Sequence, residues 1–83
     1  MTESETRERV KKLILERTAV PEEDFRFDML LREELLLESF LLVNLLCELE
    51  DMFRTEIPDD AFPYIFTPED LVDLVKENHE KDG

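Results

Sequence analysis

The sequence predicts an all-α fold: a small four-helix bundle with three main helices, one short helix, and a long loop between the first and second. Three observations lead to this prediction. Apolar residues recur every three to four positions in three segments, no segment alternates apolar and polar residues as a strand does, and the four prolines fall at segment ends or between segments. A chain of 83 residues has room for one domain with a small core, so residues 1–83 are expected to form a single domain.

The first helix is expected at about residues 5–18, with Thr2 or Ser4 as its N-cap. Val10, Leu13 and Ile14 follow helical spacing and should face the core. Pro21 should end this helix, because the residue before a proline is biased away from the helical conformation. Residues 21–34 then form a long loop, held against the core by five apolar side chains: Phe25, Phe27, Met29, Leu30 and Leu31.

The clearest helix is expected at residues 39–53, with Ser39 as its N-cap. A helical projection places one apolar stripe toward the core, formed by Leu42, Leu45, Leu46, Leu49 and Phe53. On the opposite side lies a second strip, Phe40, Val43 and Cys47, edged by Asn44, Glu48, Glu50 and Asp51. Such a strip can be buried in a larger protein, but this chain has few elements to cover it, which favours a docking surface.

The last helix has a strong start signal. After Pro58, residues 59–64 have room for one short helical turn, interrupted by Pro63. Thr67 is then expected as an N-cap and Pro68 as the first helical residue, with two acids in the first turn. The helix should run to about residue 78 and fray beyond it, with a core stripe of Leu71, Leu74 and Val75, and Val72 beside them.

Composition limits the classes of partner. Ten Lys and Arg against 23 Asp and Glu give a net charge of −13, which argues against nucleic acid and anionic membranes. Residues 1–19 carry a net +1 and residues 20–83 carry −14, so a basic protein partner would be steered to the middle and end of the chain. A single cysteine excludes a disulfide framework, and no apolar stretch resembles a signal peptide or a membrane span. We therefore expect a cytoplasmic monomer without membrane insertion.

Several motifs, at the right separations across residues 8–75, resemble those of acyl carrier proteins. Residues 38–40, Glu-Ser-Phe, stand where that family has Asp-Ser-Leu. The other matching segments are residues 8–12 in the first helix, residues 49–53 and 55–60 around the Glu-Ile-Pro-Asp turn, and residues 67–70 at the start of the last helix. The resemblance implies an acyl-carrier-like bundle that presents cargo to enzymes and is not itself an enzyme.

The resemblance also implies a covalent cofactor and a set of partners. A Mg²⁺-dependent phosphopantetheinyl transferase would attach 4′-phosphopantetheine from coenzyme A to Ser39, with Glu38 meeting a basic group or the metal of that enzyme. Acyl-loading, condensing or transferring enzymes with basic docking patches, in fatty-acid, lipid, lipopolysaccharide or polyketide synthesis, would then bind the strip and its acids. We expect the acyl chain to be sheltered among eight apolar residues: Leu46, Leu49, Ile57, Phe62, Ile65, Leu71, Leu74 and Val75.

Departures from the family pattern leave alternatives open. The family usually has glycine two or three residues before the acid of the serine motif, and residues 35–37 here are all leucine. Without that glycine the loop is expected to enter the helix differently. The Ser-Phe pair and residues 67–68 also resemble D-alanyl carriers, so an aminoacyl or peptidyl carrier is an alternative. A third possibility is an unmodified acidic helical module. We expect no metal site, since His79 and Cys47 are each the only residue of their type.

Overall fold

Three α-helices and two 3₁₀ helices make up the part of the chain that the computed structural model describes, residues 2–82, with side chains as far as residue 78. In chain order they are α1 (Glu3–Arg17), η1 (Glu22–Asp24), α2 (Ser39–Phe53), η2 (Asp59–Tyr64) and α3 (Pro68–Asp82). Residues 2–82 contain no strand, so the predicted all-helical bundle is confirmed. The sequence did not predict η1, and α3 continues through Asp82 where fraying was expected after residue 78.

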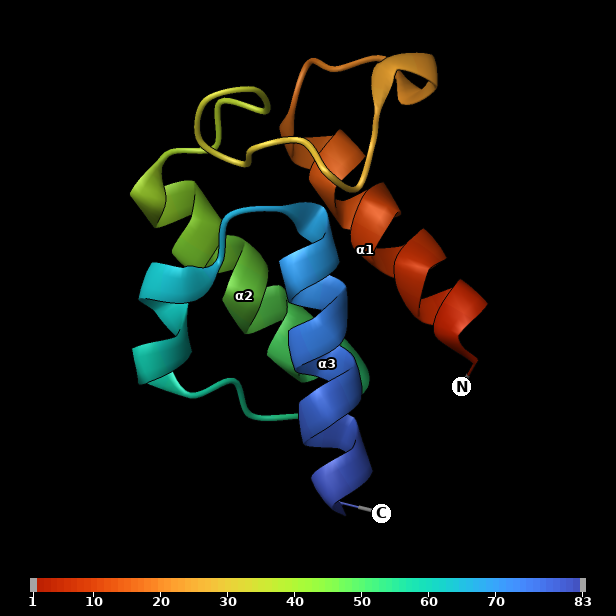
Figure 1. Ribbon diagram of the computed structural model, residues 1–83, viewed down its shortest axis with the longest axis vertical. Coiled ribbons are helices and arrows are strands. Elements are labelled where there is room, and N and C mark those ends of the chain that lie inside the picture. The colour runs from red at the N-terminus through yellow and green to blue at the C-terminus, as the bar shows by residue number, and fades with distance from the viewer. Residues whose placement is uncertain (1, 83) are drawn as a thin grey trace.

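The core lies where the three α-helices meet. Both α1 and α2 pack against α3, and α1 also contacts α2. Figure 1 shows the long loop crossing one end of this bundle and η2 lying beside α2, on the side away from α1. The most deeply buried helical residues come from all three helices: Val10 and Ile14, Leu42, Leu45 and Leu49, and Leu71, Val72 and Val75. Val72 is therefore part of the core, whereas Leu74, predicted to be in the core stripe, is only half-buried.

The cap predicted for α3 is confirmed, and Thr2 rather than Ser4 caps α1, which begins at Glu3, two residues before the expected start. The Thr2 side chain caps α1 by accepting a hydrogen bond from the Glu5 amide at 3.2 Å. At the start of α3, the Asp70 amide donates to the Thr67 hydroxyl at 3.3 Å, while the Asp70 carboxylate accepts from the Thr67 amide at 3.0 Å. This reciprocal pair is a capping box, which satisfies amides that the helix itself leaves without partners.

Basic residues of α1 hold the long loop against the bundle. Arg7 lies 5.1 Å from the centre of the Phe27 ring, and Lys11 lies 5.8 Å from the centre of the Phe25 ring. The two rings meet edge to face, with centroids 5.1 Å apart. The loop is thus pinned as predicted, except that Leu30 is 40% exposed. Its carbonyl accepts two amides in a tight turn that presents the side chain to solvent.

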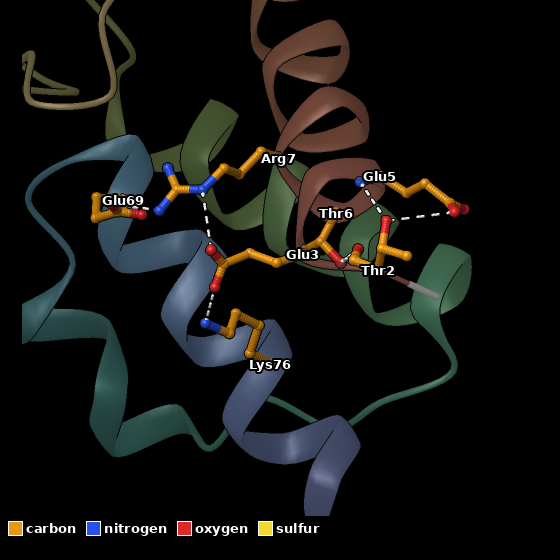
Figure 2. A network of polar contacts seen from close by, with 7 residues as sticks. All are labelled: Thr2, Glu3, Glu5, Thr6, Arg7, Glu69 and Lys76. Atoms are coloured by element: carbon orange, nitrogen blue, oxygen red, sulfur yellow. Dashed lines mark hydrogen bonds and ion pairs between the residues drawn. The ribbon is translucent and has the colours of Figure 1, made fainter.

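A polar network joins α1 to α3 near the chain ends (Figure 2). Arg7 donates to the Glu69 carboxylate at 2.8 Å, and Glu3 lies between Arg7, at 3.8 Å, and Lys76. The nearby Lys76 ammonium, and after it the Arg7 guanidinium, hold the pKa of the Glu3 carboxyl below its ordinary value. These residues lie at the opposite ends of the sequence, so the network fixes how the first and last helices sit together.

Within residues 2–82, no helix has the length and apolar character that crossing a membrane requires.

Candidate functional site

Ser39 is the first residue of α2, and its side chain is exposed. The N-cap position belongs to Glu38, whose extended backbone (φ −71°, ψ 162°) precedes the helix and whose carbonyl accepts the Leu42 amide at 2.9 Å. The prediction that Ser39 is the N-cap was therefore wrong by one position. Among the hydrogen bonds of the described residues, none involves the Ser39 hydroxyl, and the Glu38 side chain makes no capping bond.

The chemistry of this position follows from the helix end. The first amides of an α-helix have no partner within the helix, and the aligned peptide dipoles make this end positive. A group with a negative charge attached to Ser39 would lie against those amides. The start of α2 thus combines a reachable hydroxyl with an electrostatic environment that favours a phosphate.

The loop reaches this helix through a left-handed residue. Leu36 has φ of 58°, and its side chain is 73% exposed, while Leu35 and Leu37 on either side are buried. The Leu37 amide donates to the Leu31 carbonyl at 2.8 Å, which closes the turn. The left-handed turn before α2 is thus made at a leucine, with no glycine in the loop. The anchoring of the two neighbouring leucines keeps the left-handed turn, at a steric cost of about 1–2 kcal/mol.

The second apolar strip of α2 is at the surface. Phe40 is 66% exposed and Val43 48%, and Cys47 is exposed as well. The alternative that a larger core covers this strip is therefore wrong for the chain by itself. We call Phe40, Val43 and Cys47 the α2 strip.

The acids around the α2 strip differ in what they contact. Glu48 forms an ion pair with Arg17 of α1. Glu50 is half-buried, and its carboxylate accepts the Ile57 amide at 2.9 Å, which ties the end of α2 to the following loop. Asp51 is exposed, as is Asn44, and among the ion pairs of the described residues Asp51 takes part in none. Asp51 is thus the acid of this rim that is freest to meet a partner.

A cleft of about 300 Å³ lies between α2 and η2, next to the α2 strip. It is lined by Val43, Leu46, Cys47, Glu50, Ile57, Pro58, Asp59 and Phe62. Three of the eight residues predicted to shelter a cargo line it, namely Leu46, Ile57 and Phe62. Of the other five, Leu49, Ile65, Leu71 and Val75 are buried in the close-packed core and Leu74 is half-buried, so the structure does not gather all eight around this cleft.

Sequence reasoning missed part of the cleft lining. Val43 and Cys47 were assigned to docking alone, and Pro58 and Asp59 only to a turn. Val43 follows Ser39 by four residues, so the two lie one above the other on α2. That i, i+4 spacing could have shown that Val43 lies near the serine, but not that η2 forms a cleft with it.

No protein-family model matches the chain. Among the described side chains, no group of three or more His, Cys, Asp or Glu residues is placed to hold a metal ion. The side chain of His79 lies outside the described residues.

Proposed function

We propose that the protein is an acyl carrier that holds its cargo as a thioester on a 4′-phosphopantetheine arm attached to Oγ of Ser39. The observation that carries this proposal is the state of that hydroxyl. It is exposed at the first position of α2, takes part in none of the hydrogen bonds among the described residues, and lies at the positive end of the helix. A serine that served only as a helix cap would stand one residue earlier, with its oxygen bonded to a backbone amide.

The residues fit this group. On attachment, Ser39 Oγ forms a bond to the phosphorus of pantetheine phosphate, the pyrophosphate bond of coenzyme A breaks, and adenosine 3′,5′-bisphosphate leaves as the hydroxyl proton passes to base. The attached arm supplies the thiol that carries the cargo. The chain's own part is to keep Oγ accessible, to place helix amides beside the phosphate, and to offer the cleft of α2 and η2 one turn away.

The α2 strip supports the presentation of this site to other enzymes. An apolar surface with an acidic rim, directly following the attachment residue, suits a transferase or acyl-handling enzyme that carries a basic patch. The bulk of the charge, −14 within residues 20–83, lies in the same part of the chain. Association would therefore be steered toward the start of α2.

One observation favours aminoacyl cargo as a second candidate. Glu50 and Asp59 are among the residues that line this mostly apolar cleft, and the Glu50 carboxylate also accepts the Ile57 amide. An ammonium group on the cargo would find opposite charges there, which an alkyl chain would not use. The two candidates share the attachment at Ser39 and differ only in the cargo.

The decisive test is mass spectrometry after incubation with coenzyme A, Mg²⁺ and a promiscuous phosphopantetheinyl transferase. We expect one mass increment of phosphopantetheine on the wild-type protein and none on Ser39→Ala. Ser4→Ala removes the only other serine of the chain and should leave the modification intact. Both variants should keep the helical circular dichroism of the wild type. A wild-type protein that stays unmodified, or a modified Ser39→Ala, would reject the proposal and favour the unmodified module.

A further inference from the structure

Arg32 in the long loop is held by an aromatic ring. Its guanidinium carbon lies 5.8 Å from the centre of the Phe62 ring of η2. The side chain is exposed, and among the ion pairs of the described residues Arg32 takes part in none. In a chain with 23 acids, an arginine that stacks on phenylalanine and pairs with no carboxylate keeps its charge available.

Two contacts link the surroundings of Arg32 to those of Ser39. On the loop side, the neighbouring Leu31 accepts the amide of Leu37, two residues before Ser39, at 2.8 Å. On the cleft side, Phe62 lines the same cleft as Val43, which lies one turn after Ser39 along α2. Arg32 therefore joins the loop before α2 to Phe62 of η2, a residue of the cleft wall.

The nearby acids do not neutralise Arg32. Glu34, two residues away, accepts the Leu30 amide at 2.9 Å and lies 3.9 Å from Arg26. Glu33 and Glu38 are exposed, and neither appears among the described ion pairs with Arg32. Among the described residues, the Arg32 guanidinium thus has no carboxylate partner and is available to a phosphate.

We propose that Arg32 is a positioning residue that binds the phosphodiester of the arm on Ser39 and directs the arm toward the cleft of α2 and η2. The proposal rests on the proposed function. A guanidinium can stack its plane on a ring while its N–H groups donate in that plane to phosphate oxygens, so the contact with Phe62 need not break. Arg32 and the amides at the start of α2 would then hold the phosphate from two sides.

The experiment uses full-length protein loaded with unacylated phosphopantetheine, with modification verified first by mass. Wild type, Arg32→Gln, Arg32→Lys and Arg9→Gln are compared by NMR. Arg9→Gln is the matched control, since Arg9 is an exposed arginine of α1 and its replacement changes net charge equally. In the wild type, we expect attachment to shift the Nε–H resonance of Arg32 and leave that of Arg9 in place. The ³¹P line should narrow in Arg32→Gln, because the phosphate becomes more mobile, and remain near wild type in Arg9→Gln.

Salt supplies a second readout. Raising ionic strength from about 0.1 M to about 1 M shortens the Debye length from roughly 10 Å to 3 Å, so the wild-type ³¹P line should approach that of Arg32→Gln. Arg32→Lys keeps the charge but loses the planar pair of donors. Its ³¹P line width should therefore lie between those of the wild type and Arg32→Gln. If Ser39 is modified but the Arg32 resonance does not move and the two Gln variants behave alike, the role of Arg32 is rejected and the proposed function stands. If Ser39 accepts no arm, both are rejected.

Discussion

Single residues hold left-handed backbone at both ends of α2 without glycine. Leu36 precedes the helix with φ of 58°, and Arg54 ends it with φ of 51° and ψ of 51°. The Arg54 and Thr55 amides both donate to the Glu50 carbonyl, which satisfies the helix end. The only glycine of the chain is residue 83, so both left-handed positions are occupied by residues with a Cβ, which makes this backbone conformation strained. Burial of the neighbours of Leu36 offsets the cost on the side of Ser39.

Replacing Leu36 with glycine should stabilise the protein slightly. The left-handed strain of about 1–2 kcal/mol is relieved, and the greater freedom of glycine in the unfolded chain costs about 0.5–1 kcal/mol. The exposed side chain gives up little burial. We expect a free energy of unfolding up to about 1 kcal/mol higher in urea titration.

The control for this prediction is Leu37→Gly, because Leu37 is buried and lies next in the chain. Loss of its side chain should destabilise the protein by about 2–5 kcal/mol. A Leu36→Gly protein that is clearly less stable than wild type would mean that the left-handed turn is not strained.

At the scale of one element, α2 has a distinct contact on each of its sides. Leu42, Leu45 and Leu49 face the core, while Phe40 and Val43 face solvent. Val43 and Cys47 of the α2 strip also line the cleft with η2, and Val43 lies one turn after Ser39. One helix thus carries the proposed attachment residue, the α2 strip and one wall of the cleft, so under the proposed function a partner bound to the strip would also lie beside the cargo.

Charge-reversal substitutions on α2 should distinguish residues that affect docking from residues that affect stability. With a phosphopantetheinyl transferase, we expect Asp51→Lys to raise KM severalfold at low salt and to leave the unfolding midpoint near wild type. Asp51 is exposed and takes part in no ion pair among the described residues. The salt dependence of KM should also weaken.

Glu48→Lys is the informative comparison, because Glu48 pairs with Arg17 of α1. Lysine at residue 48 would lie next to the Arg17 cation. Glu48→Lys should therefore lower the unfolding midpoint as well as raise KM. If neither substitution nor salt changes KM, the apolar α2 strip drives docking and the acids do not contribute.

At the scale of the whole molecule, a small core stabilises the fold while a large negative charge destabilises it. The network of Glu3, Arg7, Glu69 and Lys76 joins the first and last helices, while the net charge of −13 repels itself in the folded state (Figure 2). A domain of this size has little stability to spare. Added burial by an attached cargo should therefore be visible in a thermal melt.

We expect acyl cargo to raise the unfolding midpoint in order of chain length until the cleft is full. Each buried CH₂ contributes about 0.8 kcal/mol, and 1 kcal/mol shifts the midpoint of a domain this size by roughly 4–8 °C. The measurement is a melt of the unloaded, alanyl, hexanoyl and decanoyl forms at fixed pH and salt. The cleft of about 300 Å³ is open to solvent on one side of α2, so the rise should level off early.

The alanyl form is the internal control, because it has almost no apolar surface to bury. Its midpoint should stay near that of the unloaded arm. Flat midpoints across all forms would reject sequestration of the chain, and a rise confined to the alanyl form would favour the aminoacyl carrier, through the carboxylates of Glu50 and Asp59.

The sequence by itself determined the helical class, the core stripe of α2 and the start of α3. These features depend on local rules: apolar spacing over one helix, and a capping box within four residues of Thr67. It also indicated the exposed strip of Phe40 and Val43, because helical periodicity separates two faces without knowledge of what packs on either. The start of α2 at Ser39 is local in the same way, because the end of the loop and the apolar spacing of the helix are adjacent in the chain.

Only the tertiary structure decided the features that join distant segments. Leu36 adopts a left-handed turn that is closed by the hydrogen bond from the Leu37 amide to the Leu31 carbonyl. Glu48, at the rim of the α2 strip, forms an ion pair with Arg17 of another helix. The walls of the cleft are formed by α2 and η2. Of the eight residues predicted to form one cavity, some line this cleft and others lie in the core. Arg32 stacks on Phe62, 30 residues along the chain. Local propensity says nothing of such contacts, because they form only once loop closure has brought separate elements together.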